Sequence, residues 1–203
     1  MQLLSVNDVS VFVASLRSGQ SAIFPTETSY GLGCDATNQA AVDVIFKIKD
    51  RSDTKPLLIV VPTVAMAERY LVWNRALEQL ARKYWPGPLT IVGEYNTSAV
   101  PALAKGVVGA DGTVAVRVSA DHWLQRVTSE LSRPLVATSA NISGQEALYD
   151  SAQAGHIFKG HAIGPDVLAD GGVLLKVPAT TLVRIVGGAL EVLRQGGLKI
   201  VLE

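Results

Sequence analysis

Two short polar stretches lie in an otherwise apolar chain, and both carry side chains of the kind that bind ligands. One is residues 24–33, FPTETSYGLG, and the other is residues 134–141, PLVATSAN. Each is joined to an apolar segment typical of a buried strand. Hydroxyl and amide groups at the end of a buried strand cost free energy unless they pair with one another or with a ligand. The two stretches therefore indicate a binding site.

A third polar segment, residues 47–56, carries the fixed charges that such a site would use. Its sequence, KIKDRSDTKP, holds four cations and two anions at the expected end of a helix. One interpretation is a solvated helix terminus, where lysine complements the helix dipole. The segment also runs directly into the apolar residues 57–61, which places some of its cations near the mouth of a strand. Arginine and lysine together suit a triphosphate, because one offers a planar fork and the other a compact charge.

Residues 113–118, TVAVRV, are expected to form a strand with two different faces. Alternate side chains of a strand point to opposite faces, so the three valines share one face, which packs in the core. Thr113, Ala115 and Arg117 share the other face. An arginine among small residues favours a cavity that holds a carboxylate or a phosphate. An edge-strand arginine facing solvent is the alternative.

Ser139 and Asn141 stand two residues apart after an apolar segment, so their side chains can converge. A turn cap is the simpler explanation for a single residue of this type. It does not explain the whole run of hydroxyl and amide groups in residues 137–144, ATSANISG. Convergence on a ligand is the better interpretation.

Other catalytic chemistries find less support. Residues 31–36, GLGCDA, match a dinucleotide-binding spacing, but that motif joins a strand directly to a helix, and here the next helix is expected to begin near Asn38. The sequence has no G-x-S-x-G nucleophile motif. The three histidines, His122, His156 and His161, lack a partnered serine and lack metal-ligand spacing, so we expect them on the surface.

The composition indicates a globular protein of one domain, residues 1–203. Apolar residues make up 48% and charged residues 18%, and the formal net charge is zero. A neutral chain has no global attraction for nucleic acid or an anionic membrane. A single cysteine, Cys34, excludes an intrachain disulfide framework. The sequence shows neither a signal peptide nor a membrane-spanning segment, so we expect a cytoplasmic protein and no membrane partner.

The apolar spacing predicts a mixed α/β unit. Ser5 or Asn7 is expected to cap the first helix and Gly19 to end it, and residues 95–112 are expected to form a mobile loop. The predicted helices cover residues 6–16, 38–49, 64–72, 75–84, 121–131 and 151–158. The predicted strands cover residues 21–24, 57–61, 89–94, 113–118, 135–138, 167–169, 181–186 and 190–194.

Taken in order, four motifs closely resemble the YrdC-like domain of threonylcarbamoyl-AMP synthases. They are PTETSYGLG at 25–33, Lys49-x-Arg51, TVAVR at 113–117 and Ser139-x-Asn141. The resemblance implies a single-domain fold, a twisted open mixed sheet flanked by helices, with a concave, positively charged cleft. Because little chain follows residue 198, the length resembles the short form of the family, without the additional C-terminal domain of the longer form.

The resemblance also implies a nucleotidyltransferase. The family forms L-threonylcarbamoyl-AMP and pyrophosphate from L-threonine, bicarbonate or CO₂, and ATP, for threonylcarbamoyl modification of a tRNA adenosine. It implies ATP as a substrate, Mg²⁺ with the nucleotide, tRNA or double-stranded RNA as a further partner, and hand-off of the product to a tRNA threonylcarbamoyl-transfer complex.

Residue roles follow from the matched motifs, and none of them is a protein metal ligand. Lys49 and Arg51 would be catalytic. ATP would be bound by Lys49, Arg51, Lys55, Thr113, Ser139, Asn141 and Arg194. Threonine would be bound by Thr28, Arg117 and Thr180.

Two other functions fit the same residues. A basic cleft suits a double-stranded RNA or tRNA backbone, which would make the protein a binding module without turnover. A related adenylate-forming enzyme with another amine substrate would use the same phosphate-side groups.

Overall fold

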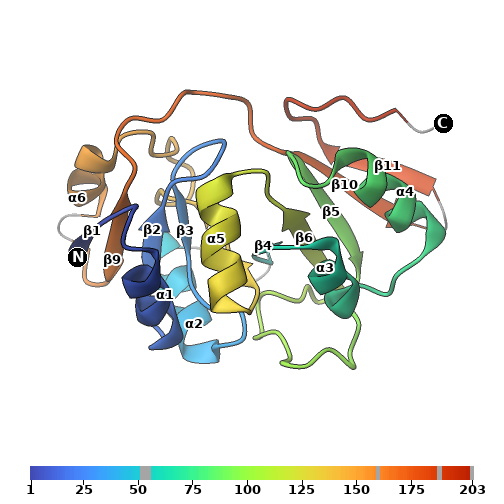
Figure 1. The fold of residues 1–203 in the computed structure, drawn as a ribbon, viewed down its shortest axis with the longest axis horizontal. Helices are drawn as coiled ribbons and strands as arrows, with labels where there is room; N and C mark the ends of the chain where they lie inside the picture. Colours follow the sequence, from blue (N-terminus) through green and yellow to red (C-terminus); the bar gives the residue numbers. More distant parts are fainter. Residues whose placement is uncertain (51–55, 159–160, 187–188, 202–203) are drawn as a thin grey trace.

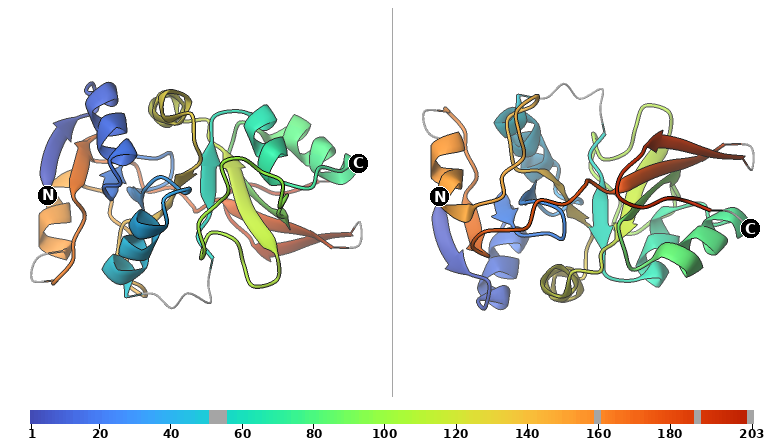
Figure 2. Two further views of the ribbon diagram at one scale, coloured as in Figure 1. Left: turned by 90° about the horizontal axis from the view of Figure 1, so that it is seen from below. Right: turned by 90° about the horizontal axis from the view of Figure 1, so that it is seen from above.

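The structure is a computed structural model that describes residues 1–50, 56–158, 161–186 and 189–201. It contains one sheet of five strands and one of six, which lie side by side with helices packed against them (Figure 1). The predicted α/β class is therefore confirmed, although the strands form two mixed sheets rather than one. The residues between β9 and β10 cross from the first sheet to the second (Figure 2).

The first sheet has the order β1-β9-β2-β3-β8. Its first three strands pair in parallel, and β2, β3 and β8 pair antiparallel. The strands are β1 (Gln2–Ser5), β2 (Ala22–Phe24), β3 (Gly31–Gly33), β8 (Thr138–Ser139) and β9 (Val167–Asp170). The helical elements of this part are α1 (Val9–Arg17), α2 (Gln39–Lys49), the 3₁₀ turn η1 (Ser151–Gln153) and α6 (Ala154–Ile157).

The second sheet has the order β11-β10-β5-β6-β4-β7. Its strands are β4 (Ile59–Val61), β5 (Leu89–Glu94), β6 (Thr113–Val118), β7 (Leu135–Val136), β10 (Thr181–Val186) and β11 (Ala189–Arg194). Its helices are α3 (Val64–Tyr70) and α4 (Arg75–Tyr84). As the strand parity predicts, Val114, Val116 and Val118 of β6 are buried.

Helix α5 (His122–Leu131) links the two halves, because it packs on α1 and on β4 (Figure 1). Its carboxylate cap, Asp121, accepts a hydrogen bond from the backbone of Leu124 at 2.8 Å. The buried face of α5 joins a core cluster with α1, β2 and Val60 of β4. This cluster fixes the first sheet relative to the second and so sets the space between them.

The predicted strand 135–138 is wrong in one respect, because the structure divides it into β7 and β8. β7 pairs with β4 in the second sheet, and β8 pairs with β3 in the first. The backbone N–H of Val136 also donates to the carbonyl of Cys34 at 2.9 Å. Residues 134–139 therefore connect the two sheets, and the apolar run reflects burial in both.

Most of the other elements agree with the predictions, and the differences have local causes. Asp8 occupies the N-cap of α1 rather than Ser5 or Asn7, and Gly19 follows the helix with φ +87°. The strands β1 and β3 are not predicted. Residues 95–112 are irregular as expected, but they are held to the core, since Ala104 donates to Ala36 and Leu57 donates to Gly106, both at 2.9 Å.

The pair Gly31 and Gly33 allows strands to approach closely rather than forming a nucleotide loop. A Cβ atom on Gly33 would lie 1.7 Å from the carbonyl oxygen of Val136. We expect Gly33→Ala to lower the free energy of unfolding by about 3 kcal/mol or more, because backbone must move to admit the methyl group. Urea denaturation of the purified protein measures this change.

Gly155 in α6 is the matched control, because a Cβ there meets nothing within 4 Å. Gly155→Ala should be neutral or stabilising by about 0.5–1 kcal/mol, as alanine favours helix. Equal stabilities for the Gly33 and Gly155 variants would contradict the close approach of β3 to residues 134–136.

Candidate active site

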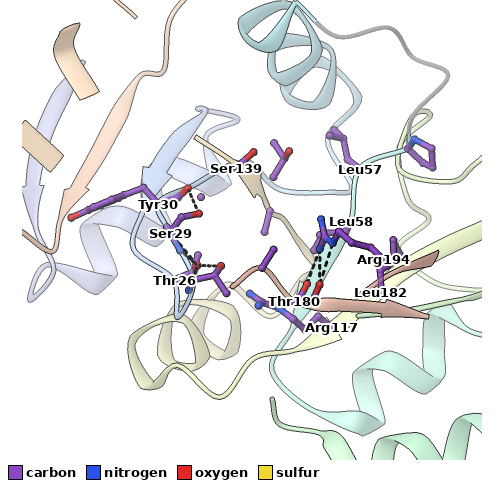
Figure 3. Close-up of a pocket in the computed structure, with 17 residues that line it drawn as sticks. Thr26, Ser29, Tyr30, Leu57, Leu58, Arg117, Ser139, Thr180, Leu182 and Arg194 are labelled. Carbon is purple, nitrogen blue, oxygen red and sulfur yellow. Dashed lines mark hydrogen bonds between the residues drawn. The ribbon is translucent and has the colours of Figure 1, made fainter. Parts of the chain in front are cut away.

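A cavity of about 320 Å³ lies where the two sheets meet (Figure 3). One wall comes from the β2–β3 loop and β8, and the other comes from β6, β10 and the end of β11. The lining residues are Thr26, Thr28, Ser29, Tyr30, Gly31, Pro56, Leu57, Leu58, Ala115, Arg117, Ala137, Thr138, Ser139, Ala179, Thr180, Leu182 and Arg194. Its volume is at the lower end of the range typical of small-molecule sites.

The β2–β3 loop presents its hydroxyl groups through a compact turn. The hydroxyl of Thr26 donates to the carbonyl of Ser29 at 2.7 Å and accepts from the backbone N–H of Thr28 at 3.2 Å. The hydroxyls of Thr26 and Thr28 also lie 3.2 Å apart. Side-chain hydroxyls that bond their own backbone stabilise such turns. Thr28, which is predicted to bind threonine, is held by this turn and lines the cavity.

Lys49, Ser139 and Asn141 form one hydrogen-bonded cluster, in which Lys49 and Asn141 are buried and Ser139 is half-buried. Lys49 is the last residue of α2 and is only 2% exposed. Its ammonium group donates to the carbonyl of Ser139 at 2.6 Å, to the carbonyl of Asn141 at 3.0 Å and to the Asn141 side-chain oxygen at 2.7 Å. The Ser139 hydroxyl donates to the same side-chain oxygen at 2.8 Å.

These contacts show how the lysine acts on the site. An ammonium group has three donors, and these three acceptors match them. Lys49 therefore holds the 139–141 turn in shape and places a positive charge directly behind it. Ser139 itself lines the cavity, so the turn faces the ligand space while the charge lies in the layer beneath.

Arg117 of β6 reaches the cavity from the second sheet and is 4% exposed. Its guanidinium nitrogen Nη2 lies 3.2 Å from the Glu27 carboxylate oxygen Oε2. Burial lowers the pKa of Arg117, and the nearby Glu27 and Asp121 carboxylates oppose that shift. Arginine keeps its charge across the physiological range, so this wall carries a fixed cation.

The pairing with Glu27 leaves unused hydrogen-bonding capacity. Within the described residues, neither Arg117 Nε nor Glu27 Oε2 has a hydrogen-bond partner, although both atoms are buried. The 3.2 Å contact is thus an ion pair without good hydrogen-bond direction. An unpaired buried donor costs roughly 1–3 kcal/mol, so Arg117 is suited to a ligand carboxylate that would satisfy it.

Thr180 and Arg194 meet at the rim of the cavity (Figure 3). Arg194 donates to the Thr180 carbonyl through Nε at 3.2 Å and through Nη2 at 2.9 Å. The Thr180 hydroxyl lies 3.0 Å from that of Thr90. Arg194 lines the cavity and is exposed to solvent. Thr180, predicted to bind threonine, and Arg194, predicted to bind ATP, therefore both line the cavity.

Of the predicted ATP-binding residues that the structure describes, Lys49, Asn141 and Thr113 do not line the cavity, although Lys49 and Asn141 contact Ser139, which does. The Thr113 hydroxyl donates to the Asp111 carboxylate at 2.7 Å, and that carboxylate also pairs with Arg184. Thr113 lies at the start of β6, outside the cavity lining. Arg51 and Lys55 fall outside the described residues.

Several residues that shape the cavity are not predicted from the sequence. Glu27 and Tyr30 belong to the first polar stretch but are not predicted as functional. The Tyr30 hydroxyl donates to the Gly172 carbonyl at 2.8 Å and accepts from the Gly171 N–H at 2.9 Å, which ties the β2–β3 loop to the chain after β9. The apolar residues Leu57 and Leu58 also line the cavity. Their position directly after the charged segment 47–56 was the sequence signal that could have indicated them.

His122, His156 and His161 are all exposed, as predicted. A cluster of three or more metal-binding side chains is not found among the residues searched. In the same residues, no helix is both long enough and apolar enough to span a membrane.

The cavity between the two sheets of this mixed α/β fold combines hydroxyl groups with arginine side chains, a composition that suits a small charged ligand. The family model Sua5/YciO/YrdC, described as "Telomere recombination", matches residues 14–196. The chain therefore belongs to the Sua5/YciO/YrdC family. The family resemblance predicted from the four motifs is confirmed.

Two curated relatives are named threonylcarbamoyl-AMP synthase. The one from Vibrio vulnificus is 38% identical over 146 residues, which cover 69% of this chain and 75% of the relative. The one from Pyrococcus abyssi is 34% identical over 194 residues, covering 94% of this chain and 54% of the relative. The chain thus spans about half the length of the archaeal protein.

Solved structures show the same fold. A crystal structure of Pyrococcus abyssi Sua5 complexed with L-threonine matches with a TM-score of 0.85 and 30% identity, covering 97% of this chain and 57% of that one. Escherichia coli YciO matches with a TM-score of 0.81, covering 97% of this chain and 94% of that one. At 20% identity, the YciO match shows the fold alone.

Proposed function

We propose that this protein is an L-threonylcarbamoyladenylate synthase, a nucleotidyltransferase that uses L-threonine, bicarbonate or CO₂, and ATP. The observation that carries the proposal is the convergence of Ser139, Thr28 and Arg117 on one cavity, with the Lys49 charge buried behind it. The names of the curated relatives and the threonine-bound Sua5 structure support the same conclusion.

The phosphate side of the site is the part nearest Ser139. Its hydroxyl, the buried charge of Lys49 and the exposed charge of Arg194 would face the nucleotide. Asn141 shapes the same turn by accepting from Lys49 and from Ser139. By family resemblance, Arg51, Lys55 and Thr113 would join them.

The threonine side is the part nearest Arg117. The guanidinium would bind the substrate carboxylate, which would give the unpaired Nε an acceptor. The hydroxyl of Thr28 and that of Thr180 lie on the same walls and would orient the amino acid.

The reaction then needs positioning and charge neutralisation rather than a protein nucleophile. The threonine amine adds to CO₂ and loses a proton, which yields a carbamate. A carbamate oxygen attacks the α-phosphorus of ATP, and the bond to the β-phosphate oxygen breaks to release pyrophosphate. Fixed cations and oriented donors stabilise the charge that develops on the phosphates.

Mg²⁺ would accompany the nucleotide, because the polyphosphate supplies the oxygen ligands that this ion prefers. The hydroxyl, amide and cationic groups of this cavity fit a nucleotide that brings its own ion. When bound, the ion would neutralise charge on the pyrophosphate. Because the product would serve tRNA modification, we also propose that the protein acts in the cytoplasm and that tRNA and the complex that receives the product are its partners.

Pyrophosphate release distinguishes the candidate functions. The purified protein is mixed with ATP, Mg²⁺ and bicarbonate, with L-threonine, L-serine or no amino acid, and release is followed with a coupled pyrophosphatase. We expect threonine-dependent release together with a threonylcarbamoyl-AMP mass. Preference for a different amine would indicate the related adenylate-forming enzyme. Steeply salt-dependent RNA binding without ATP turnover would indicate the binding module.

A further inference from the structure

Glu27 crosses the boundary between the two sheets. It belongs to the β2–β3 loop of the first sheet, yet its contacts are with the second sheet and the start of α5. One carboxylate oxygen, Oε1, accepts from the Ser119 hydroxyl at 2.7 Å and from the Ala120 N–H at 3.2 Å. The other oxygen, Oε2, lies 3.2 Å from Nη2 of Arg117.

These contacts place Glu27 behind the cavity wall. Its neighbours Thr26 and Thr28 line the cavity, whereas Glu27 touches the arginine that does so. The Glu27 side chain is 21% exposed and that of Arg117 is 5% exposed. A substrate carboxylate would meet Arg117, not Glu27, and the two carboxylates would share one guanidinium.

The geometry of the Glu27–Arg117 pair suits orientation of the guanidinium better than stabilisation of the fold. A buried ion pair is weak support for stability, because desolvation offsets much of the Coulomb attraction. Here Oε2 and Arg117 Nε are both left without hydrogen-bond partners among the described residues, so the pair is not arranged for maximum strength. It does fix one edge of the guanidinium and leaves the Nε edge unpaired.

We propose that Glu27 is a positioning residue that holds Arg117 in place for the amino-acid substrate and sets the threonine half of the cavity by joining the two sheets. This inference rests on the proposed function, because it concerns the same site. Since Oε1 is anchored to Ser119 and Ala120, the carboxylate cannot follow the guanidinium freely. The position of Arg117 therefore depends on the β2–β3 loop.

The substitution Glu27→Gln tests this role with little change in shape. The amide keeps an oxygen that can accept from Ser119, but its NH₂ group would face the guanidinium, donor against donor. We expect the KM for L-threonine to rise roughly tenfold to hundredfold, as small misplacements of a binding group typically cost. The KM for ATP should stay within about twofold of the wild-type value.

The conservative variant and a matched control complete the design. Glu27→Asp keeps the charge on a shorter side chain, so its threonine KM should lie between those of the wild type and Glu27→Gln. Glu78→Gln breaks an exposed glutamate–arginine pair on α4, with Arg82, and should leave both KM values unchanged. Isothermal calorimetry of L-threonine binding and thermal melting are measured on all four proteins.

The outcomes separate the inference from the function. If the wild type binds threonine and releases pyrophosphate while Glu27→Gln matches it, the inference is wrong and the function stands. Equal rises in both KM values with a lowered melting temperature would show a merely structural role and also overturn the inference. If the wild type neither binds threonine nor releases pyrophosphate, both proposals fail. If Glu27→Gln does not fold, Glu27→Asp decides, since an unchanged threonine affinity there overturns the positioning role.

Discussion

Replacing Lys49 with alanine should reduce threonine-dependent pyrophosphate release roughly hundredfold to thousandfold, the range seen when an electrostatic donor is removed. The reason is structural as well as electrostatic. The ammonium group holds two backbone carbonyls and the Asn141 side chain, and all three acceptors would lose this donor. The free energy of unfolding should therefore fall by about 2–4 kcal/mol. Coupled pyrophosphate assays and urea denaturation measure the two effects.

Lys47 is the matched control, because it lies in the same last turn of α2 but is exposed. Lys47→Ala should retain wild-type turnover and stability. Wild-type turnover in Lys49→Ala would remove Lys49 from the site. A loss in both variants would point to the general charge of this helix end instead.

Replacing Arg117 with alanine should raise the KM for L-threonine by about a hundredfold or more, because truncating one partner of a buried charge interaction typically costs 2–5 kcal/mol. The KM for ATP should change far less. The substitution also leaves Glu27 without its counter-charge. Because that carboxylate is partly exposed, we expect a stability loss of about 1–3 kcal/mol, below that of a fully buried charge.

The double variant Arg117→Met with Glu27→Gln separates the two consequences. It removes both charges, so stability should recover toward the wild type, while threonine binding should stay weak. Arg126→Ala, on the exposed face of α5, serves as the arginine control. If Arg117→Ala binds L-threonine with the wild-type affinity, Arg117 does not bind the amino-acid carboxylate.

The helices were predictable because their signals are local. Asn38, Thr63, Asn74 and Asp121 each cap a helix with a side-chain oxygen, and apolar spacing marks the buried face of each. Long strands such as β5 and β6 were predicted with the correct bounds. The strands β1 and β3, and the division into β7 and β8, were not predicted. A strand of two to four residues has too few positions to show alternation, and its existence depends on partners far along the chain.

The candidate site was predicted in part. The residue patterns indicated Arg117 and Ser139, and the family resemblance added Thr28, Thr180 and Arg194. The structure brings these five residues to one cavity. Asn141 and Lys49 were also indicated, but the sequence did not show which groups the Lys49 ammonium contacts. The residue patterns suggested a phosphate ligand, whereas the contacts show an ammonium group engaged by the 139–141 turn. Glu27 was overlooked because its partner lies ninety residues away in the chain.

The order and types of residues were sufficient to indicate the α/β class, the family and several of the groups that line the cavity. Those properties depend on neighbours in the chain, since caps, periodicity and short motifs are read over a few positions. The division into two sheets, the cavity at their junction and the Glu27–Arg117 pair required the folded chain. Each arises from contacts between distant segments, and such contacts depend on how β4, β6, β8 and α5 pack together rather than on any one stretch of sequence.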